Sequence, residues 1–180
     1  MEYLSMTRDA FEKHINSTRT LPINKVTVSA AILRKDSTKK KQILLLKRNE
    51  EEQYYPNVFE IPGGKFDATD NSIQAAIIRE VAEETHLTVS HIISSLPPMT
   101  YTTEKTIAGV SGEAPRSVLR HAFQLNYAVA IEGDGTGFCV NKDEHSMGVW
   151  ACADDLASLP MTAEMRCLVS EVLDVAGEVL

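Results

Sequence analysis

Long apolar runs are missing from this 180-residue chain, and so is any excess of positive charge. No apolar stretch approaches the roughly 20 residues that a membrane-spanning helix requires. The first residues alternate charged and apolar side chains, and they lack the apolar centre of a signal peptide. We therefore expect a cytoplasmic protein that does not enter a membrane.

Cysteine is scarce, and Cys139, Cys152 and Cys167 do not have the close spacing of paired metal ligands. We expect reduced, partly buried thiols and no zinc site. The net charge of −7 and the lack of a long basic run argue against binding duplex nucleic acid through its phosphates. A small phosphorylated molecule is still allowed as a partner, because it needs only a few local cations and a metal ion.

The residues that are present indicate one globular domain, because 180 residues suit a single core and the proportions of 43% hydrophobic and 24% charged residues are ordinary. Residues 1–24 predict an extension made of a short amphipathic helix, from Arg8 to Ile15, and a polar linker. We assign residues 25–180 to the main domain.

Hydrophobic periodicity predicts strands and helices along the whole main domain. The predicted strands are 26–33, 43–47, 58–61, 89–96, 118–131 and 147–151. The predicted helices are 72–85 and 162–176, with one helical turn at 153–158. The pair Pro97-Pro98 is expected to end the fourth strand, and residues 100–116 are expected to form a hairpin or a mobile loop. This order predicts an α/β sandwich with a mixed sheet.

The first helix of the main domain carries three glutamates, Glu80, Glu83 and Glu84, whose spacing puts them on one side. One apolar stripe of the helix is formed by Ile73, Ile77 and Val81. Glu80 and Glu84 fall within this stripe, and Glu83 flanks it. Because Ile78 and Ala82 line the opposite side, we expect the helix to be covered on both faces.

Glutamates on a helix are most often exposed, and the sequence EVAEE alone would be interpreted in that way. Carboxylates that face a core cost several kcal/mol each unless they are paired or bind a metal ion. Arg79 can pair with Glu83, but one arginine cannot neutralise three carboxylates. We therefore expect Mg²⁺, with Mn²⁺ as a substitute, because carboxylate oxygens suit these ions better than zinc.

A glycine-rich turn precedes this helix. Gly63 and Gly64 allow the backbone to approach a ligand closely, and carbonyl groups there can bind a hard cation. Lys65 follows directly and can meet a phosphate. PGGK alone would indicate an ordinary tight turn, but beside the acidic helix it indicates a site for a phosphorylated substrate.

Residues 64–87, GKFDATDNSIQAAIIREVAEETHL, resemble the Nudix box, G-x5-E-x7-R-E-U-x-E-E-x-G-U, in which U is aliphatic. The preceding FEIPGG is similar to the lead-in of many members. The loop is one residue longer than the pattern, so Asp70 or Asn71 replaces the early glutamate, and His86 replaces the late glycine at an expected left-handed helix cap. The resemblance covers residues 26–176 and implies a Nudix-type α/β/α sandwich with a mixed β-sheet.

The resemblance also implies roles for individual residues. Glu80 and Glu84 would be the main metal ligands, and the Gly63 carbonyl would complete the coordination sphere. Glu83 would be a further ligand or the base that activates water. Outside the box, our candidate for the catalytic base is Glu144, and its neighbours Asp143 and His145 are alternatives.

Substrate contacts are implied on both sides of the glycine turn. Arg48 and Lys65 would hold phosphate oxygens, and Gly64 would let the backbone approach them. Phe59 is the aromatic residue that we expect closest to the ligand. Other aromatic residues that could stack on a base are Tyr54, Tyr55, Tyr101 and Trp150, and residues 101–120 are expected to set specificity.

Enzymes of this family hydrolyse a pyrophosphate bond in a nucleoside diphosphate linked to another group, such as a nucleotide sugar, ADP-ribose or a nucleoside triphosphate. One alternative is a hydrolase of non-nucleotide diphosphates or an enzyme like isopentenyl diphosphate isomerase, although none of the three cysteines lies near the box. A second alternative is a non-catalytic module that senses a nucleotide. The resemblance allows a homodimer, because many members dimerise, but no residue pattern in this chain fixes the oligomeric state.

Overall fold

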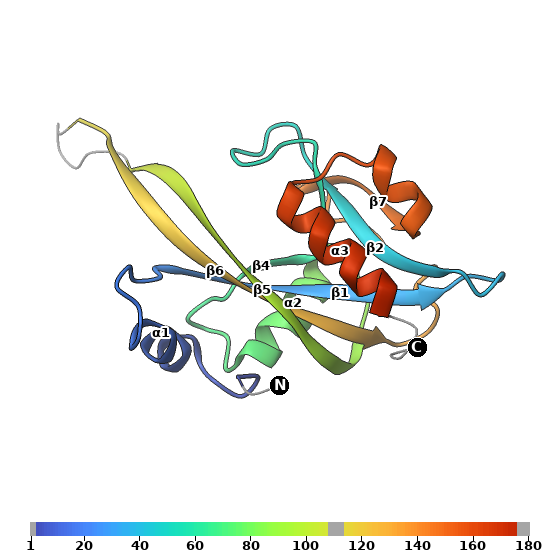
Figure 1. The fold of residues 1–180 in the computed structure, drawn as a ribbon, viewed down its shortest axis with the longest axis horizontal. Helices are drawn as coiled ribbons and strands as arrows, with labels where there is room; N and C mark the ends of the chain where they lie inside the picture. Colours follow the sequence, from blue (N-terminus) through green and yellow to red (C-terminus); the bar gives the residue numbers. More distant parts are fainter. Residues whose placement is uncertain (1–2, 108–113, 176–180) are drawn as a thin grey trace.

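The structure is a computed structural model that describes residues 3–107 and 114–175. Its helices are α1 (Arg8–Asn16), α2 (Ile73–Thr85) and α3 (Ala163–Val175), with a 3-10 helix η1 (Ala153–Ser158) (Figure 1). Its strands are β1 (Lys25–Lys35), β2 (Lys41–Arg48), β3 (Phe59–Glu60), β4 (Gly63–Lys65), β5 (Val89–Ile107), β6 (Arg116–Ile131) and β7 (His145–Ala151).

The strands form a mixed sheet in the order β3-β2-β1-β6-β5, and β4 and β7 add to it by pairing with β1 and β2. The pair β1–β6 is parallel, and the other pairs are antiparallel. Side chains alternate between the two faces of a strand. In β1 the residues Val26, Val28, Ala30 and Ile32 therefore join one core, while Ala31 and Leu33 join another.

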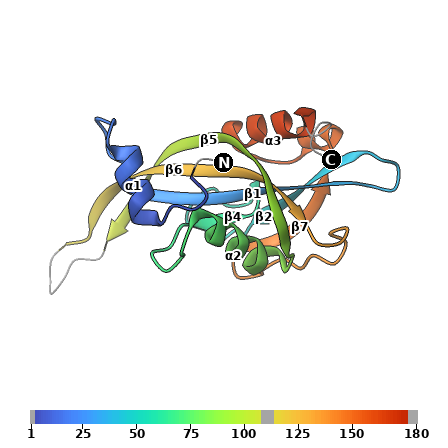
Figure 2. The same cartoon turned by 90° about the horizontal axis from the view of Figure 1, so that it is seen from below.

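The two cores place a helix on each side of the sheet, so the α/β/α sandwich is confirmed. Ile73, Ile77 and Val81 of α2 belong to the first core, and Leu168 and Val169 of α3 belong to the second. Figure 2 shows α3 and α2 on opposite sides of the layer formed by β1 and β6.

The N-terminal extension is packed onto the main domain. Phe11 of α1 is fully buried in the first core. The Asn16 side chain donates to the Ile23 carbonyl (2.9 Å) and accepts from the Ile23 N–H (2.7 Å), which holds the segment between α1 and β1 in place. The start of α2 is bonded to the extension as well, because Ile73 N–H donates to the Met6 carbonyl. The boundary between an extension of residues 1–24 and a main domain of residues 25–180 stays a prediction.

The prediction that Pro97-Pro98 ends a strand is wrong. β5 continues through both prolines to Ile107, with a shift of register between Leu96 and Met99. β5 lies at the edge of the sheet, so a proline without an N–H group costs no hydrogen bond on the side that has no neighbouring strand. The bulge accommodates the proline rings.

The hairpin alternative for residues 100–116 is correct up to Ile107 and from Arg116, since β5 and β6 form a long ribbon that projects beyond the helices in Figure 1. Residues 108–113 lie outside the described residues, as does Ala176 of the predicted last helix.

Helix α2 begins and ends as its sequence predicts. The Ser72 hydroxyl accepts from the Ala75 N–H at the N-cap (3.1 Å), and His86 closes the other end in the left-handed conformation (φ 56°). Burial on both faces was a wrong prediction, because Ile78 is 39% exposed and Ala82 is exposed. A single face of α2 meets the core, and that face includes Glu80 and Glu84.

The cysteines are all free thiols, as expected, but only Cys152 is buried, whereas Cys139 and Cys167 are exposed. Among the described residues, no helix has the length and apolar character that crossing a membrane would demand.

Candidate active site

The glutamates Glu80 and Glu84 of α2 are buried beneath the glycine turn. Glu80 is 7% exposed and Glu84 is 2% exposed. The N–H of Gly63 donates to Glu84 Oε2 over 2.8 Å. Glu83, in contrast, is exposed. The predicted apolar stripe therefore divided the three acids correctly, because the core-facing side of the helix contains Glu80 and Glu84 but not Glu83.

Both positions of the glycine pair in β4 require glycine, because other atoms lie too close to each of them for a side chain to fit. A Cβ atom at Gly63 would lie 2.3 Å from the carbonyl oxygen of Val28 in β1. A Cβ atom at Gly64 would lie 2.5 Å from Glu80 Oε2. Real Cβ atoms do not come this close to other atoms. Gly63 thus lets β4 lie against β1, and Gly64 leaves the space that the Glu80 carboxylate occupies.

Arg79 holds the acidic helix to the preceding loop. Its Nε and Nη2 donate to the two carboxylate oxygens of Asp70 over 2.9 Å and 2.8 Å, and Nη2 also donates to the Lys65 carbonyl. Its Nη1 lies 2.8 Å from Glu80 Oε1 and 3.0 Å from Glu83 Oε2. Asp70 is the acid that replaces the early glutamate of the motif, and the arginine at its side lowers the pKa of Asp70.

Burial raises the pKa of Glu80 to about 7, against the opposing effect of Arg79 and with further repulsion from Glu83 and Glu144. Burial also raises the pKa of Glu84 well above its usual value, and the charges of Glu60, Glu80 and Glu144 add to this increase. The donated bond from Gly63 works in the opposite direction but does not compensate. These acids therefore repel one another and gain from a nearby cation.

Oxygen ligands with uncompensated negative charge are the donor set that a hard divalent cation prefers, so the side chains of the site fit such an ion chemically. As the side chains stand, no three histidine, cysteine or acidic groups among residues 3–107 and 114–175 could hold a metal ion together. The reason is visible in the contacts. Arg79 holds Glu80 and Glu83, and the Gly63 N–H holds Glu84.

The loop after β6 brings Glu144 towards these acids. The N–H groups of Cys139 and Asn141 donate to the carbonyls of Thr85 and Glu84 at the end of α2. The His86 ring contacts the Cys139 carbonyl at 3.0 Å, so His86 both ends the helix and holds this loop. Glu144 itself is exposed, and its charge contributes to the raised pKa of Glu80 and Glu84.

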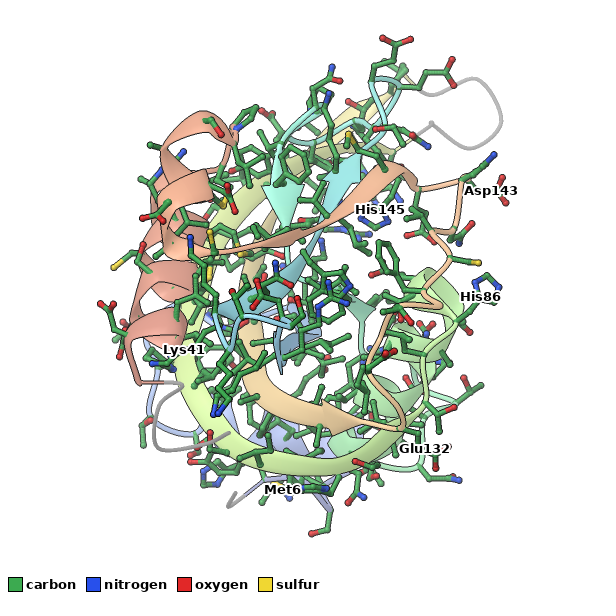
Figure 3. All side chains as sticks on the ribbon, turned by 90° about the vertical axis from the view of Figure 1, so that its right-hand side faces the viewer. Met6, Lys41, His86, Glu132, Asp143 and His145 are labelled. Atoms are coloured by element: carbon green, nitrogen blue, oxygen red, sulfur yellow. The ribbon has the colours of Figure 1, made fainter. Side chains whose placement is uncertain are left out.

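The two alternatives to Glu144 lie elsewhere. Asp143 is exposed and points away from the molecule at its edge, as Figure 3 shows. His145 is 1% exposed, and its Nε2 lies 3.4 Å from Glu60 Oε1. Of these three neighbouring residues, Glu144 is the one whose charge affects both buried glutamates.

A cleft leads away from the glycine turn across the face of the sheet that carries α3. It consists of two adjoining hollows of about 140 Å³ and 170 Å³. Gly63, Gly64 and Lys65 line one end, and Tyr54 and Tyr55 line the other. The residues that line both hollows are Lys25, Arg48, Glu60, Tyr101, Gln124 and Met165.

Arg48 lies in this cleft, where it is already bonded. Its Nη1 lies 2.6 Å from Glu60 Oε1, its Nη2 lies 2.5 Å from Glu52 Oε2, and its Nε donates to the Tyr54 carbonyl. Burial tends to raise the pKa of Glu60, but bonds from His145 and Arg48 outweigh it and leave that pKa below its usual value. Glu60 was missed as a site residue, although FEIPGG places it directly before the turn.

The remaining predicted contacts divide into two groups. Lys65 is exposed, lines the cleft, and pairs with Asp67 at 2.7 Å. Phe59 is 4% exposed and packs in the second core rather than lining the cleft. A two-residue strand exposes one residue to each face, and in β3 the aromatic residue faces the core while Glu60 faces the cleft. Trp150 is not among the residues that line the cleft. Its ring packs against the Arg34 guanidinium group, whose Cζ atom lies 4.1 Å from the ring centroid.

Metal-free protein should lose stability as the pH rises, because Glu80 binds its proton more tightly when folded than when unfolded. This contribution is fully present below the unfolded pKa of 4.5 and is lost as the pH passes the folded pKa of about 7. We expect Glu80→Gln to raise the unfolding free energy on the order of 2 kcal/mol at pH 8, and to change it little at pH 4.5. Chemical denaturation in a chelator at both pH values measures this.

The matched control is Glu171→Gln, which removes one exposed carboxylate from α3. We expect it to leave the pH dependence of stability unchanged. A difference between Glu80→Gln and wild type that is the same at both pH values would contradict the prediction.

A model of the NUDIX domain family matches residues 24–172 of this chain. A relative named as Nudix hydrolase NudL, from Enterobacter sp. (strain 638), is 35% identical over 80 residues. That match spans 43% of this chain and 42% of the relative, so it covers less than half of either protein.

Solved structures with a similar fold cover more of the chain. A MutT NUDIX hydrolase from Burkholderia pseudomallei is 26% identical with a TM-score of 0.58, covering 82% of this chain and 97% of that one. The NUDIX domain of Shewanella oneidensis NrtR, solved with ADP ribose, is 17% identical with a TM-score of 0.62, covering 94% and 98%. An Ap4A hydrolase from C. elegans is 22% identical with a TM-score of 0.51, covering 85% and 98%.

Proposed function

The chain belongs to the Nudix family, and from this premise we propose that it is a Mg²⁺-dependent enzyme that hydrolyses a pyrophosphate bond in a nucleoside diphosphate linked to another group. The observation that supports this most strongly is the burial of Glu80 and Glu84 below Gly63 and Gly64 at the end of a cleft. A chain that used these positions only for stability would gain by replacing both acids with apolar residues.

The metal ion would be held by Glu80 and Glu84, with Glu83 and the Gly63 carbonyl as further ligands. A bound Mg²⁺ or Mn²⁺ supplies charge neutralisation at the phosphate oxygens and lowers the pKa of a bound water. One nitrogen of the Arg79 guanidinium group contacts the carboxylates of both Glu80 and Glu83. These contacts hold the two acids together on the side of α2 nearest the turn.

The other residues act by positioning and by proton transfer. Asp70 fixes Arg79, because its carboxylate accepts two parallel bonds from the guanidinium group. Glu144 is exposed on a loop bonded to the end of α2, where it can accept a proton from the attacking water. Lys65 and Arg48 supply positive charge along the cleft for phosphate oxygens.

Substrate candidates come from the cleft and from similar proteins. The cleft contains Tyr54, Tyr55 and Tyr101, whose rings can pack against a base or a sugar. The similar structures include one that contains ADP ribose and one of an Ap4A hydrolase. ADP-ribose, diadenosine tetraphosphate and nucleoside triphosphates are therefore the first compounds to test.

We expect purified protein to hydrolyse at least one of these compounds when Mg²⁺ or Mn²⁺ is present, and none in a chelator, because the phosphate oxygens then lack the cation that neutralises their charge. Phosphate release after treatment with a phosphatase measures the reaction. Prenyl diphosphates belong in the same panel, because turnover of them alone would support the non-nucleotide alternative. A protein that binds these nucleotides but hydrolyses no compound would instead be a nucleotide-sensing module.

A further inference from the structure

Basic side chains gather on the cleft face of the sheet, beyond the end that carries the glycine turn. Lys25 of β1 is the register partner of Ala122 in β6, and Ala122 lies opposite Tyr101 in β5. Two residues further along the ribbon, Arg120 lies opposite Thr103. Register partners, and residues two apart in a strand, share one face of a sheet. Lys25, Tyr101, Thr103 and Arg120 therefore project from the same face.

The positive charge at this place is not compensated by ion pairs. None of the ion pairs formed within the described residues includes Lys25, Lys105 or Arg120. Burial lowers the pKa of Lys25, and the charges of Arg120, Arg48 and Lys105 lower it further. These cations are thus close enough to repel one another, and an anion between them would relieve that repulsion.

Two acids face the same cleft. Glu60 is close enough to act on Lys25, but its carboxylate already accepts from Arg48 at 2.6 Å and contacts His145. Glu164 is exposed in the first turn of α3 and lines the outer hollow, and none of the ion pairs within the described residues joins it to Lys25. Neither acid neutralises the excess positive charge.

Thr103 adds an independent observation. It is 7% exposed, lines the outer hollow, and its buried hydroxyl has no hydrogen-bond partner. Buried hydroxyl groups are nearly always bonded, so an unbonded one in a cleft points to a ligand atom. The hydroxyl and the Arg120 side chain come from positions directly opposite each other, so one phosphate group can meet both.

The distance from the reaction centre is fixed by the register of β1. Ser29 pairs with Gly63 of the glycine turn, and Lys25 lies four residues before Ser29. At about 3.3 Å per residue this separates the two ends by roughly 13 Å. That span suits the organic part of a nucleotide between two phosphate positions. The Tyr101 ring, 5.7 Å from the Lys25 ammonium, lines the space between them.

We propose that Lys25, Arg120 and Thr103 form a subsite for a phosphate monoester of the substrate that is separate from the pyrophosphate being cleaved. The preferred substrates are then nucleoside diphosphate derivatives that carry this additional phosphate. The inference rests on the proposed hydrolysis for its reaction, although binding at the subsite is measurable without any reaction. A phosphate monoester is favoured over a carboxylate because its charge of about −1.5 to −2 matches two cations.

Matched pairs of compounds that differ in one phosphate test the subsite: ADP-ribose with ADP-ribose 2′-phosphate, and dephospho-coenzyme A with coenzyme A. For at least one pair we expect kcat/KM to be about tenfold higher for the phosphorylated compound, mainly through KM, since one charge-assisted contact of this kind is worth about that factor. We expect Lys25→Met and Arg120→Gln each to abolish most of the preference. Each variant should lower the kcat/KM of the phosphorylated member much more than that of the unphosphorylated member.

Lys13→Met is the control with the same change of charge, because Lys13 is exposed on α1, which packs on the opposite face of the sheet. We expect it to keep the full preference. Equal kcat/KM values for both members of both pairs in wild type would overturn the subsite, as would an equal loss for both members in Lys25→Met.

Failure of the reaction and failure of the subsite are separable. If no compound of either pair is hydrolysed, calorimetry on the same pairs in a chelator tests the subsite alone. The proposed function is wrong only if the nucleotide panel described above is not hydrolysed either. Tighter binding of the phosphorylated compound that is lost in Lys25→Met supports the subsite, and equal binding overturns it. Because Arg120→Gln alters a half-exposed side chain, it provides the same test if Lys25→Met does not fold.

Discussion

Glu84→Gln should lower kcat by roughly a hundredfold or more while the fold remains intact. The amide keeps the shape of the side chain and can still accept the bond from the Gly63 N–H. What it removes is one negative charge at a position that is 2% exposed and faces the other acids. Turnover of the substrate identified in the panel, with Mg²⁺ in excess, measures the effect.

The same substitution should make the metal-free protein more stable near neutral pH, because it removes a buried charge that is repelled by Glu60, Glu80 and Glu144. Reduced activity together with raised stability separates a functional acid from a structural one. The control is Glu132→Gln, an exposed residue at the edge of the molecule in Figure 3, for which we expect neither change. Unchanged turnover in Glu84→Gln would show that Glu84 is not a metal ligand.

Arg79→Met should destabilise the protein by roughly 3 kcal/mol at neutral pH, because it removes the cationic partner of the buried Asp70 carboxylate and leaves it the bond from the Asp67 N–H. The side chain of Asp70 is 6% exposed, and both of its oxygens accept bonds from the guanidinium group. The variant should also lose most activity, since Arg79 contacts Glu80 and Glu83 as well. Denaturation curves and turnover of the same preparation measure both effects.

The loss of stability in Arg79→Met should also depend on pH, which provides a second test of the Arg79–Asp70 pair. Arg79 lowers the pKa of Asp70, so the stability that it contributes is present above the unfolded pKa of 3.8 and is lost as the pH falls through the folded pKa. The difference in unfolding free energy between wild type and Arg79→Met should therefore become smaller at acidic pH. Adding Asp70→Asn to Arg79→Met should restore most of the stability, but not the activity. A double variant as unstable as Arg79→Met would contradict the pairing.

Much of the site could be predicted from local sequence, because its geometry is local. The positions of Glu80 and Glu84 follow from the turn of one helix, and the predicted stripe correctly identified them as buried. The cap at His86 follows from the same helix. Burial of the exposed face, at Ile78, was predicted wrongly because the apolar pattern of one helix does not say which of two faces will be covered.

Other features could not be read from neighbouring residues. Arg48 was expected to be a phosphate ligand, and its sequence context does not show that it also pairs with Glu52 and Glu60. Phe59 and Glu60 are adjacent, so only the direction of β3 in the sheet decides which one faces the cleft. The prolines in β5 are tolerated because that strand lies at the edge, which is a property of the whole sheet.

The sequence by itself therefore determined the α/β character, the acidic helix and the family of this protein, because these depend on spacing within 30 residues of chain. Only the tertiary structure decided that Lys25 and Arg120 project from the same face of adjacent strands, and that Thr103 lies opposite Arg120 on a third strand. The parallel pairing of β1 with β6 joins residues almost one hundred positions apart. Such a pairing is selected by burial on both faces of the sheet, and no local pattern encodes it.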